Sequence, residues 1–188
     1  MFFHDDAMIA RPQRPTARIF FALVPDPPLQ AALATLGREI AGCAGGRSIP
    51  AANVHLTLAF IGDVPADRIE VLQSIVRGLT GDEFTLALDR VGTFRKAEVA
   101  WIAPTRVPEA LMRLHAALAN ALLAAEFPLE PRPFHAHLTL ARRCTRTIEQ
   151  STCAPLDWRV TRVSLMESEP AERGVRYVEL AGAGLFDA

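Results

Sequence analysis

The chain has 188 residues, of which half are hydrophobic and 22% are charged, a composition that is typical of a compact globular protein and excludes a disordered one. Lysine plus arginine number 20 against 21 for aspartate plus glutamate, and this net charge of -1 excludes a general basic surface for long nucleic acid. The three cysteines contain no Cys-x-x-Cys pair and no apolar run reaches the roughly 18 residues of a membrane helix, so we predict a protein of the reducing cytoplasm without membrane contact.

The first segment, residues 1–16, contains Pro12 and Pro15 and lacks both the basic stretch and the long apolar core of a secretory signal. We predict that it is a flexible leader and that residues 17–188 form a single domain. The domain begins with a β-rich apolar run over 17–24. Prolines from Pro25 onward end this strand, because proline cannot donate a backbone hydrogen bond.

The later elements are recognised by the period of their hydrophobic residues, which is about 3.6 in helices and 2 in strands. Strand, helix and strand occur twice in this order, which predicts a duplicated architecture with a pseudo-two-fold relation. In chain order we predict a helix from Leu29 to near Gly42, a strand over 54–61, a helix over 69–79, a hairpin of strands 84–91 and 99–103, a helix over 108–125, a strand over 134–142, a short helix near Ile148, a broken strand within 156–165 and a strand over 175–180.

Two tetrapeptides, residues 55–58 and 137–140, are identical, and each has the sequence His-Leu-Thr-Leu within a strand-like run. Successive side chains of a strand point to opposite faces, so each histidine shares a face with its threonine. Two imidazoles brought together can act as general acid and general base near neutral pH, and hydroxyl groups beside them can hold an oxyanion. The candidate residues are His55, Thr57, His137 and Thr139.

Phosphoryl transfer suits this arrangement, because the reaction needs a proton acceptor on one side of phosphorus and a proton donor on the other. The residues alone leave open which histidine is the acid. His135 and His137 also form a His-x-His pair, an alternative metal site for which no nearby Cys, Asp or Glu completes the ligands.

The surroundings of the second motif are rich in arginine, which can contact phosphate or simply lie in solvent at a strand end. We expect His115 to be a packing or surface residue of its helix. Core packing is also the expectation for four aromatic residues that could instead stack on a base. The arginines are Arg132, Arg142, Arg143 and Arg146, and the aromatic residues are Phe20, Phe94, Trp101 and Phe134.

The chain resembles the 2H phosphoesterase superfamily, and within it the RNA 2′,3′-cyclic phosphodiesterase branch, also called the 2′-5′ RNA ligase family. Family members often have proline before the second histidine, where this chain has Ala136. The resemblance runs from about residue 17 to 181, and it rests on the segments 18–23, 53–62, 91–94, 132–142 and 164–168.

This resemblance implies an α+β, bilobal, pseudo-two-fold fold with two antiparallel sheets flanking a central cleft and helices on the outside. It implies hydrolysis of a terminal 2′,3′-cyclic phosphate to a 2′-phosphate without metal or nucleotide cofactor.

The resemblance also implies roles for the site residues. By position, His55 is the expected proton donor and His137 the proton acceptor, and Thr57, Thr139 and Arg142 are expected to bind the phosphate. The expected partners are RNA ends or nucleotides that carry 2′,3′-cyclic phosphate, and a monomer is expected. Two alternatives are cleavage or formation of 2′-5′ linkages by the same groups, and a non-catalytic protein that binds RNA ends.

Overall fold

The computed structural model describes residues 16–129, 131–172 and 174–186. Except for Thr16, which opens the first strand, the predicted leader lies outside the described residues. The described strands are β1 (Thr16–Leu23), β2 (Arg47–Ser48), β3 (Leu56–Pro65), β4 (Phe84–Phe94), β5 (Val99–Pro104), β6 (Leu138–Arg142), β7 (Ser151–Val160), β8 (Arg162–Ala171) and β9 (Gly174–Gly184). The described helices are α1 (Pro27–Ala44), α2 (Ile69–Gly78) and α3 (Glu109–Ala124), with 3-10 turns at Ala51–Asn53, Ala66–Arg68 and Arg95–Ala97.

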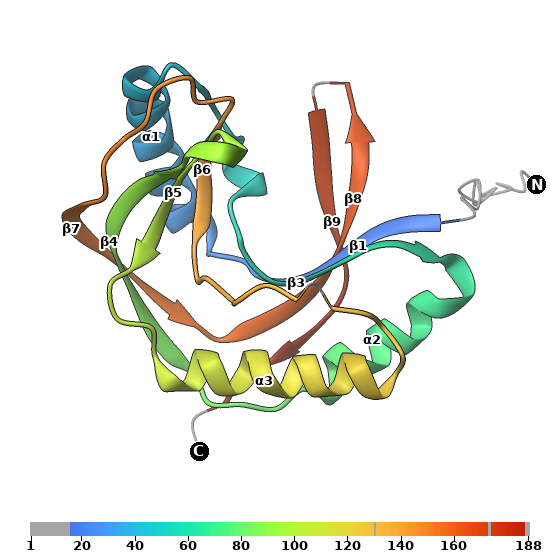
Figure 1. Cartoon of the computed structure of the whole chain (residues 1–188). Helices are drawn as coiled ribbons and strands as arrows, with labels where there is room; N and C mark the ends of the chain where they lie inside the picture. The colour runs from blue at the N-terminus through green and yellow to red at the C-terminus, as the bar shows by residue number, and fades with distance from the viewer. Residues whose placement is uncertain (1–15, 130, 173, 187–188) are drawn as a thin grey trace, which may run out of the picture.

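The strands form one open, strongly curved antiparallel sheet in the order β7-β4-β5-β6-β3-β1-β8-β9, with β2 paired to β6 (Figure 1). Its two halves meet where β3 lies beside β6, and the pair Leu56 and Leu138 joins them. The α+β, two-lobed fold is therefore confirmed, and the two predicted sheets are continuous with each other through this pair. The upright β8–β9 hairpin and the β4–β5 turn stand on opposite sides of the curved sheet (Figure 1).

The two halves of the sheet differ in which segments of the chain form them. Strands β4 to β7 all come from residues 84–160 and form one half. The other half combines β1 and β3 with β8 and β9, which are separated from them by that whole segment. The predicted repeat of strand, helix and strand is present, and each copy ends on a strand that carries one of the two identical tetrapeptides.

The helices cover the sheet face that the leucines of the motif strands share. Leu56 and Leu138 are completely buried in the main core cluster. Helix α1 packs closely on β6 at Gly37, where an added Cβ would lie 3.0 Å from the Leu140 carbonyl oxygen. Helix α2 packs against β8 and β9, and α3 runs along the base of the molecule (Figure 1). The opposite face of the motif strands is therefore left for polar side chains.

Several predicted boundaries differ from the structure for identifiable reasons. Strand β3 begins two residues late, because the Val54 N–H donates to the Ala51 carbonyl in a 3-10 turn. Strand β6 begins at Leu138, after the segment 134–137, which carries no strand. The predicted helix near Ile148 is wrong: residues 143–150 are irregular, and the Ile148 N–H donates to the Thr93 hydroxyl of β4.

Two further differences concern the ends of elements. Helix α1 extends beyond Gly42 to Ala44 and ends at Gly45, whose φ of 66° is the left-handed conformation that glycine adopts without strain. The predicted broken strand is two strands, β7 and β8, which Thr161 separates.

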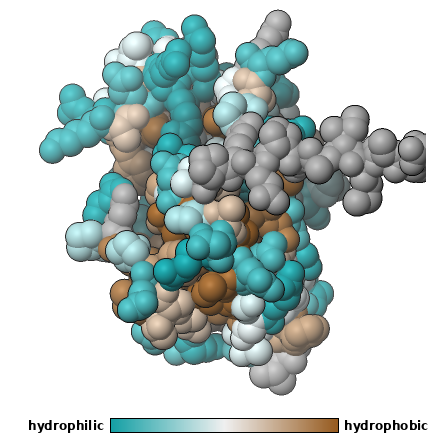
Figure 2. Space-filling view, turned by 90° about the vertical axis from the view of Figure 1, so that its right-hand side faces the viewer, coloured by the Kyte–Doolittle hydropathy of each residue, from teal (hydrophilic) through white to brown (hydrophobic). Residues whose placement is uncertain are grey.

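The surface view shows how polar and apolar residues divide on one side of the molecule. In Figure 2, hydrophilic side chains dominate the upper part, and hydrophobic ones gather in the middle of this face. Among the described residues, no helix has the length and apolar character that crossing a membrane requires.

Candidate active site

The pairing of Leu56 with Leu138 brings the two motifs together. Both leucines point into the core, so the neighbouring histidines and threonines point to the opposite, common face of the sheet. In an antiparallel pair the register runs in opposite directions. Thr57 therefore lies across from His137, and His55 lies across from Thr139. The predicted meeting of the two motifs is present in the structure, with a local two-fold relation about the leucine pair.

The same hydrogen bond orients each imidazole. His55 Nδ1–H donates to the Asn53 carbonyl oxygen at 2.8 Å, and His137 Nδ1–H donates to the His135 carbonyl oxygen at 2.7 Å. A carbonyl oxygen can only accept, so Nδ1 must carry the proton in both rings. Each Nε2 is left available to accept or deliver a proton, as acid-base chemistry requires.

Thr57 contacts the first histidine directly. Its Oγ1 lies 3.0 Å from His55 Nε2. When His55 is neutral, the threonine hydroxyl donates to Nε2; when His55 is protonated, Nε2–H becomes the donor and the hydroxyl proton is released to another acceptor. Protonation of His55 therefore makes the Thr57 hydroxyl available to an anion.

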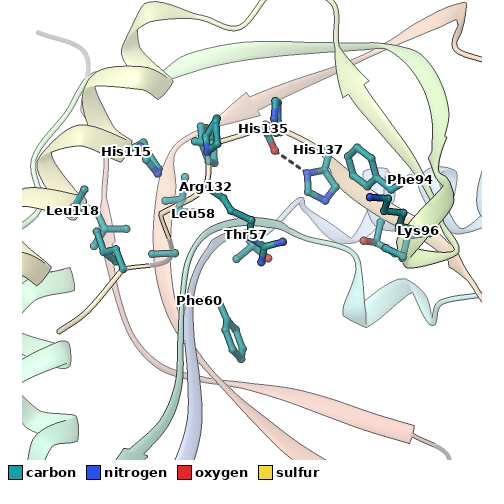
Figure 3. Close-up of a pocket in the computed structure, with 18 of the residues that line it drawn as sticks. Thr57, Leu58, Phe60, Phe94, Lys96, His115, Leu118, Arg132, His135 and His137 are labelled. Atoms are coloured by element: carbon teal, nitrogen blue, oxygen red, sulfur yellow. Dashed lines mark hydrogen bonds between the residues drawn. The ribbon is translucent and has the colours of Figure 1, made fainter.

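A cavity of about 850 Å³ extends from Thr57, His137 and Thr139 to His115 and Leu118 of α3. Figure 3 shows Thr57 between two groups of side chains, with His137, Phe94 and Lys96 on one side and His115 and Leu118 on the other. His55 is not among the lining residues, but its Nε2 lies 3.0 Å from the Oγ1 of Thr57, which is one of them. The residues that line the cavity are Thr57, Leu58, Ala59, Phe60, Phe94, Arg95, Lys96, Ala97, Val99, His115, Leu118, Ala119, Leu129, Arg132, Pro133, Phe134, His135, His137, Thr139 and Arg142.

The two histidines have different aromatic surroundings. His55 packs against Phe20 of β1 and Tyr177 of β9, with ring centroids 4.9 and 5.0 Å away. His137 meets Phe94 edge-on at 5.0 Å, and Phe94 in turn lies on Trp101 at 5.3 Å. Each imidazole is thus held by aromatic rings of its own half of the sheet, and His55 is the more enclosed.

Burial changes the protonation of both imidazoles. It lowers the pKa of His55 from 6.5 to about 4; the Asn53 carbonyl opposes this shift, and the positive charges of Arg142 and His137 add to it. Burial likewise lowers the pKa of His137. The hydrogen bond to the His135 carbonyl raises this pKa, and the charges of His135 and Arg142 lower it further. Both rings are therefore neutral at pH 7 in the free protein. A bound anion would favour the protonated form of either ring.

Arg142 completes the polar group. It lies at the end of β6 beside Arg47 of β2, lines the cavity, and acts electrostatically on both histidines. A guanidinium in this place can make charge-assisted hydrogen bonds to a phosphate. Four of the five predicted site residues line one cavity, and the fifth, His55, contacts Thr57 of its lining.

The remaining sequence candidates are placed as follows. His135 lines the cavity, and its carbonyl oxygen orients His137. Among the described residues, no group of three or more His, Cys, Asp or Glu is arranged to hold a metal ion. His115 is partly buried, as expected of a packing residue, but it also lines the cavity and stacks on Phe134 at 4.2 Å.

Sequence reasoning missed two residues at this site. Asn53 and Tyr177 both contact His55, and neither was singled out. The backbone carbonyl of Asn53 has no signature in the sequence. The one signal for Tyr177 was that it is the single tyrosine of the chain.

Comparison with known proteins places this arrangement in a family. The chain matches the 2′-5′ RNA ligase superfamily over residues 25–172. It is 32% identical over 139 residues to the RNA 2′,3′-cyclic phosphodiesterase of Escherichia coli, covering 72% of this chain and 77% of that protein. A protein of the same name from Archaeoglobus fulgidus is 27% identical over 128 residues, covering 66% and 72%.

Solved structures agree with the fold. The structure of Escherichia coli LigT complexed with 3′-AMP superposes with a TM-score of 0.83 and 27% identity, over 90% of this chain and 98% of that one. LigT in its apo form gives a TM-score of 0.82, over 93% and 100%. The match over most of the chain, together with the paired motifs on adjacent strands, shows that the chain belongs to the 2′-5′ RNA ligase superfamily.

Proposed function

We propose that this protein is an RNA 2′,3′-cyclic phosphodiesterase that hydrolyses a terminal 2′,3′-cyclic phosphate to a 2′-phosphate. The observation that carries the proposal is the pairing of the two His-x-Thr strands, which brings two Nε2 atoms and two hydroxyls to one face beside a cavity. The name and similarity of the Escherichia coli relative support the same substrate class. Both motifs come from one chain, so a monomer contains the whole site.

The proposed roles follow from proton balance. Water attacks the phosphorus, and His137 Nε2 takes a proton from it. The bond from phosphorus to the 3′ oxygen breaks, and His55 Nε2–H gives a proton to that oxygen. Thr57, Thr139 and Arg142 bind the non-bridging oxygens, where hydrogen-bond donors stabilise the developing charge.

The neutral state of His55 in the free protein is compatible with its role as acid. The cyclic phosphate carries a negative charge, which raises the pKa of a neighbouring imidazole and offsets its burial. Protonated Nε2 can no longer accept from the Thr57 hydroxyl, so this hydroxyl is released to donate to the phosphate, and the Nε2 proton is available to the 3′ oxygen. Substrate binding and protonation of the acid therefore support each other.

The two ends of the cavity suit a nucleotide with a phosphate at its centre. One end is basic, with Arg95 and Lys96 from the β4–β5 turn. The other end is aromatic, with Phe134 and His115 stacked on each other. We propose that the terminal base lies at the aromatic end and that upstream phosphates of the RNA lie toward the basic end.

The test is to identify the product formed from a dinucleotide that ends in 2′,3′-cyclic phosphate, with EDTA present. We expect a 2′-phosphate, separated from the 3′ isomer by chromatography. His55→Ala and His137→Ala should each lower kcat by roughly 10²- to 10⁴-fold, the usual worth of one proton transfer. Circular dichroism and thermal unfolding control for loss of fold.

Three outcomes would contradict the proposal. A 3′-phosphate product would reverse the leaving group, and near-native rates in either variant would exclude the acid-base pair. Binding of the cyclic phosphate without turnover would identify a protein that binds RNA ends. Incubation with two compatible RNA halves separates hydrolysis from 2′-5′ ligation.

A further inference from the structure

Asn53 connects His55 to a distant part of the chain. Its backbone carbonyl accepts the Nδ1–H of His55 at 2.8 Å, and its side-chain amide donates to the carbonyl oxygen of Val175 at 2.8 Å. Val175 lies in β9, 122 positions further along the chain. One residue thus ties the orientation of the imidazole to the β8–β9 hairpin.

Tyr177 provides a second link from the same strand. Its ring meets His55 edge-on at 5.0 Å and Phe20 edge-on at 4.9 Å, and Phe20 lies 4.9 Å from the same imidazole, so the three rings all contact one another. The His55 ring is therefore enclosed by β1 and β9, and its Nδ1 is fixed by a residue that β9 also holds. The β8–β9 hairpin supplies two of these contacts.

The second histidine has no such support from a remote strand among the described contacts. His137 is oriented by the His135 carbonyl and meets Phe94 of β4, in its own half of the sheet. It also lines the cavity, whereas His55 does not and contacts it through Thr57. The two copies of the motif are equivalent in backbone and sequence but differ in what holds their imidazoles.

We propose that Asn53 and Tyr177 are positioning residues through which the β8–β9 hairpin orients and encloses His55. The inference rests on the proposed function for its kinetic consequence. The hairpin keeps Nε2 directed toward Thr57 and the phosphate, so that the acid delivers its proton to the leaving oxygen. Neither residue is proposed to touch the reacting atoms.

The experiment compares Asn53→Asp, Tyr177→Ala and Tyr177→Phe in the full chain. Aspartate has nearly the same shape as asparagine but cannot donate to the Val175 carbonyl, while the backbone carbonyl that orients His55 is retained. We expect Asn53→Asp and Tyr177→Ala to lower kcat roughly 10- to 100-fold, the loss expected from a misplaced catalytic group, with little change in KM. Tyr177→Phe retains the ring and should stay close to wild type.

A readout independent of turnover is the pKa of His55 itself, followed by NMR of its ring proton. Burial lowers this pKa to about 4, so loosening the hairpin should raise it toward 6.5. The charged groups that act on His55, namely Arg142 and His137, are unchanged in the variants. The new carboxylate of Asn53→Asp would also raise the pKa, so Tyr177→Ala is the decisive variant for this measurement.

Arg176→Ala is the matched control. Arg176 lies between Val175 and Tyr177, and its side chain pairs with Glu169 within the hairpin, away from His55. If Tyr177→Ala leaves the His55 pKa unchanged, or if Arg176→Ala lowers kcat as much as Asn53→Asp, the hairpin has only a general structural role and the inference is overturned. If wild type fails to hydrolyse cyclic phosphate, the proposed function fails, while the NMR titration still tests the enclosure of His55.

Discussion

At the scale of single residues, the buried neutral imidazole of His55 makes stability depend on pH. Its pKa is about 4 when folded and near 6.5 when unfolded, so between these values the unfolded chain binds the proton and the folded one does not. Stability should therefore fall as pH is lowered from 6.5 to about 4. The upper limit for this residue is roughly 3 kcal/mol, from 1.36 kcal/mol per pKa unit.

Urea unfolding of wild type and His55→Gln at pH 7 and pH 4.5 tests this dependence. Glutamine does not titrate, so the variant should lose less stability over that range. The lowered pKa values of His115 and His137 act in the same direction in both proteins and cancel in the difference. Equal losses in the two proteins would mean that His55 is exposed to solvent.

Individual site residues were predictable where the sequence repeats itself. His55, Thr57, His137 and Thr139 were found because the same tetrapeptide occurs twice. The acceptors that fix their tautomers were not predictable, because a backbone carbonyl is present at every position. Sequence also could not distinguish the enclosed imidazole from the one that lines the cavity, since that difference depends on β9.

At the scale of elements, the two halves of the sheet, and with them the two motifs, are joined where β3 pairs with β6. We call this pairing the join. Leu138 pairs with Leu56 in β3 and with Ile102 in β5, and its side chain is completely buried. Leu138→Ala should lower the free energy of unfolding by about 2–5 kcal/mol, as other buried leucine truncations do. It should also lower kcat further than the loss of folded protein explains, because it loosens the pairing that brings the two motifs together.

Leu140→Ala is the control for this prediction. Leu140 lies on the same strand and is 1% exposed, but it packs beside α1 at Gly37 rather than at the join. We expect a similar loss of stability with a much smaller loss of kcat at a temperature where both variants are folded. Equal kinetic losses would show that the join has no special role.

Most elements were predictable because burial of one face imposes a period on the sequence. Helix α3 and strands β4 and β5 lie within a few residues of the prediction. The failures occur where tertiary hydrogen bonds decide the backbone, as at Ile148, whose N–H is taken by Thr93 from a distant strand. Local sequence contains no information about such a partner.

At the scale of the whole molecule, the two ends of the cavity should respond differently to substrate length. Lys96→Ala should raise KM for an oligonucleotide that ends in cyclic phosphate but not for a cyclic mononucleotide, and it should reduce the salt dependence of binding by about 0.7 in log-log slope. Phe134→Leu should raise KM for both substrates, because stacking on a base contributes about 1–3 kcal/mol.

Salt titrations of KM with both substrates measure these effects, with thermal unfolding as the control for Phe134. An equal response of the two substrates to Lys96→Ala would contradict the assignment of upstream phosphates to the basic end.

The net charge of -1 does not reveal this local basic group, so composition alone could exclude only a general basic surface. The duplicated two-lobed architecture was predictable, whereas the union of both halves in one sheet depends on a single residue pair.

The way the chain is divided between the halves has a consequence for its synthesis. Strands β4 to β7 of the half that carries His137 come from one continuous stretch, but the contact of Tyr177 with His55 requires β9, near the carboxyl end of the described chain. A nascent chain that has left the ribosome only as far as residue 160 would contain the strands of both motifs, but it would lack the Tyr177 ring that packs on His55. We therefore expect cleavage activity to emerge abruptly during translation, only when the final hairpin leaves the exit tunnel.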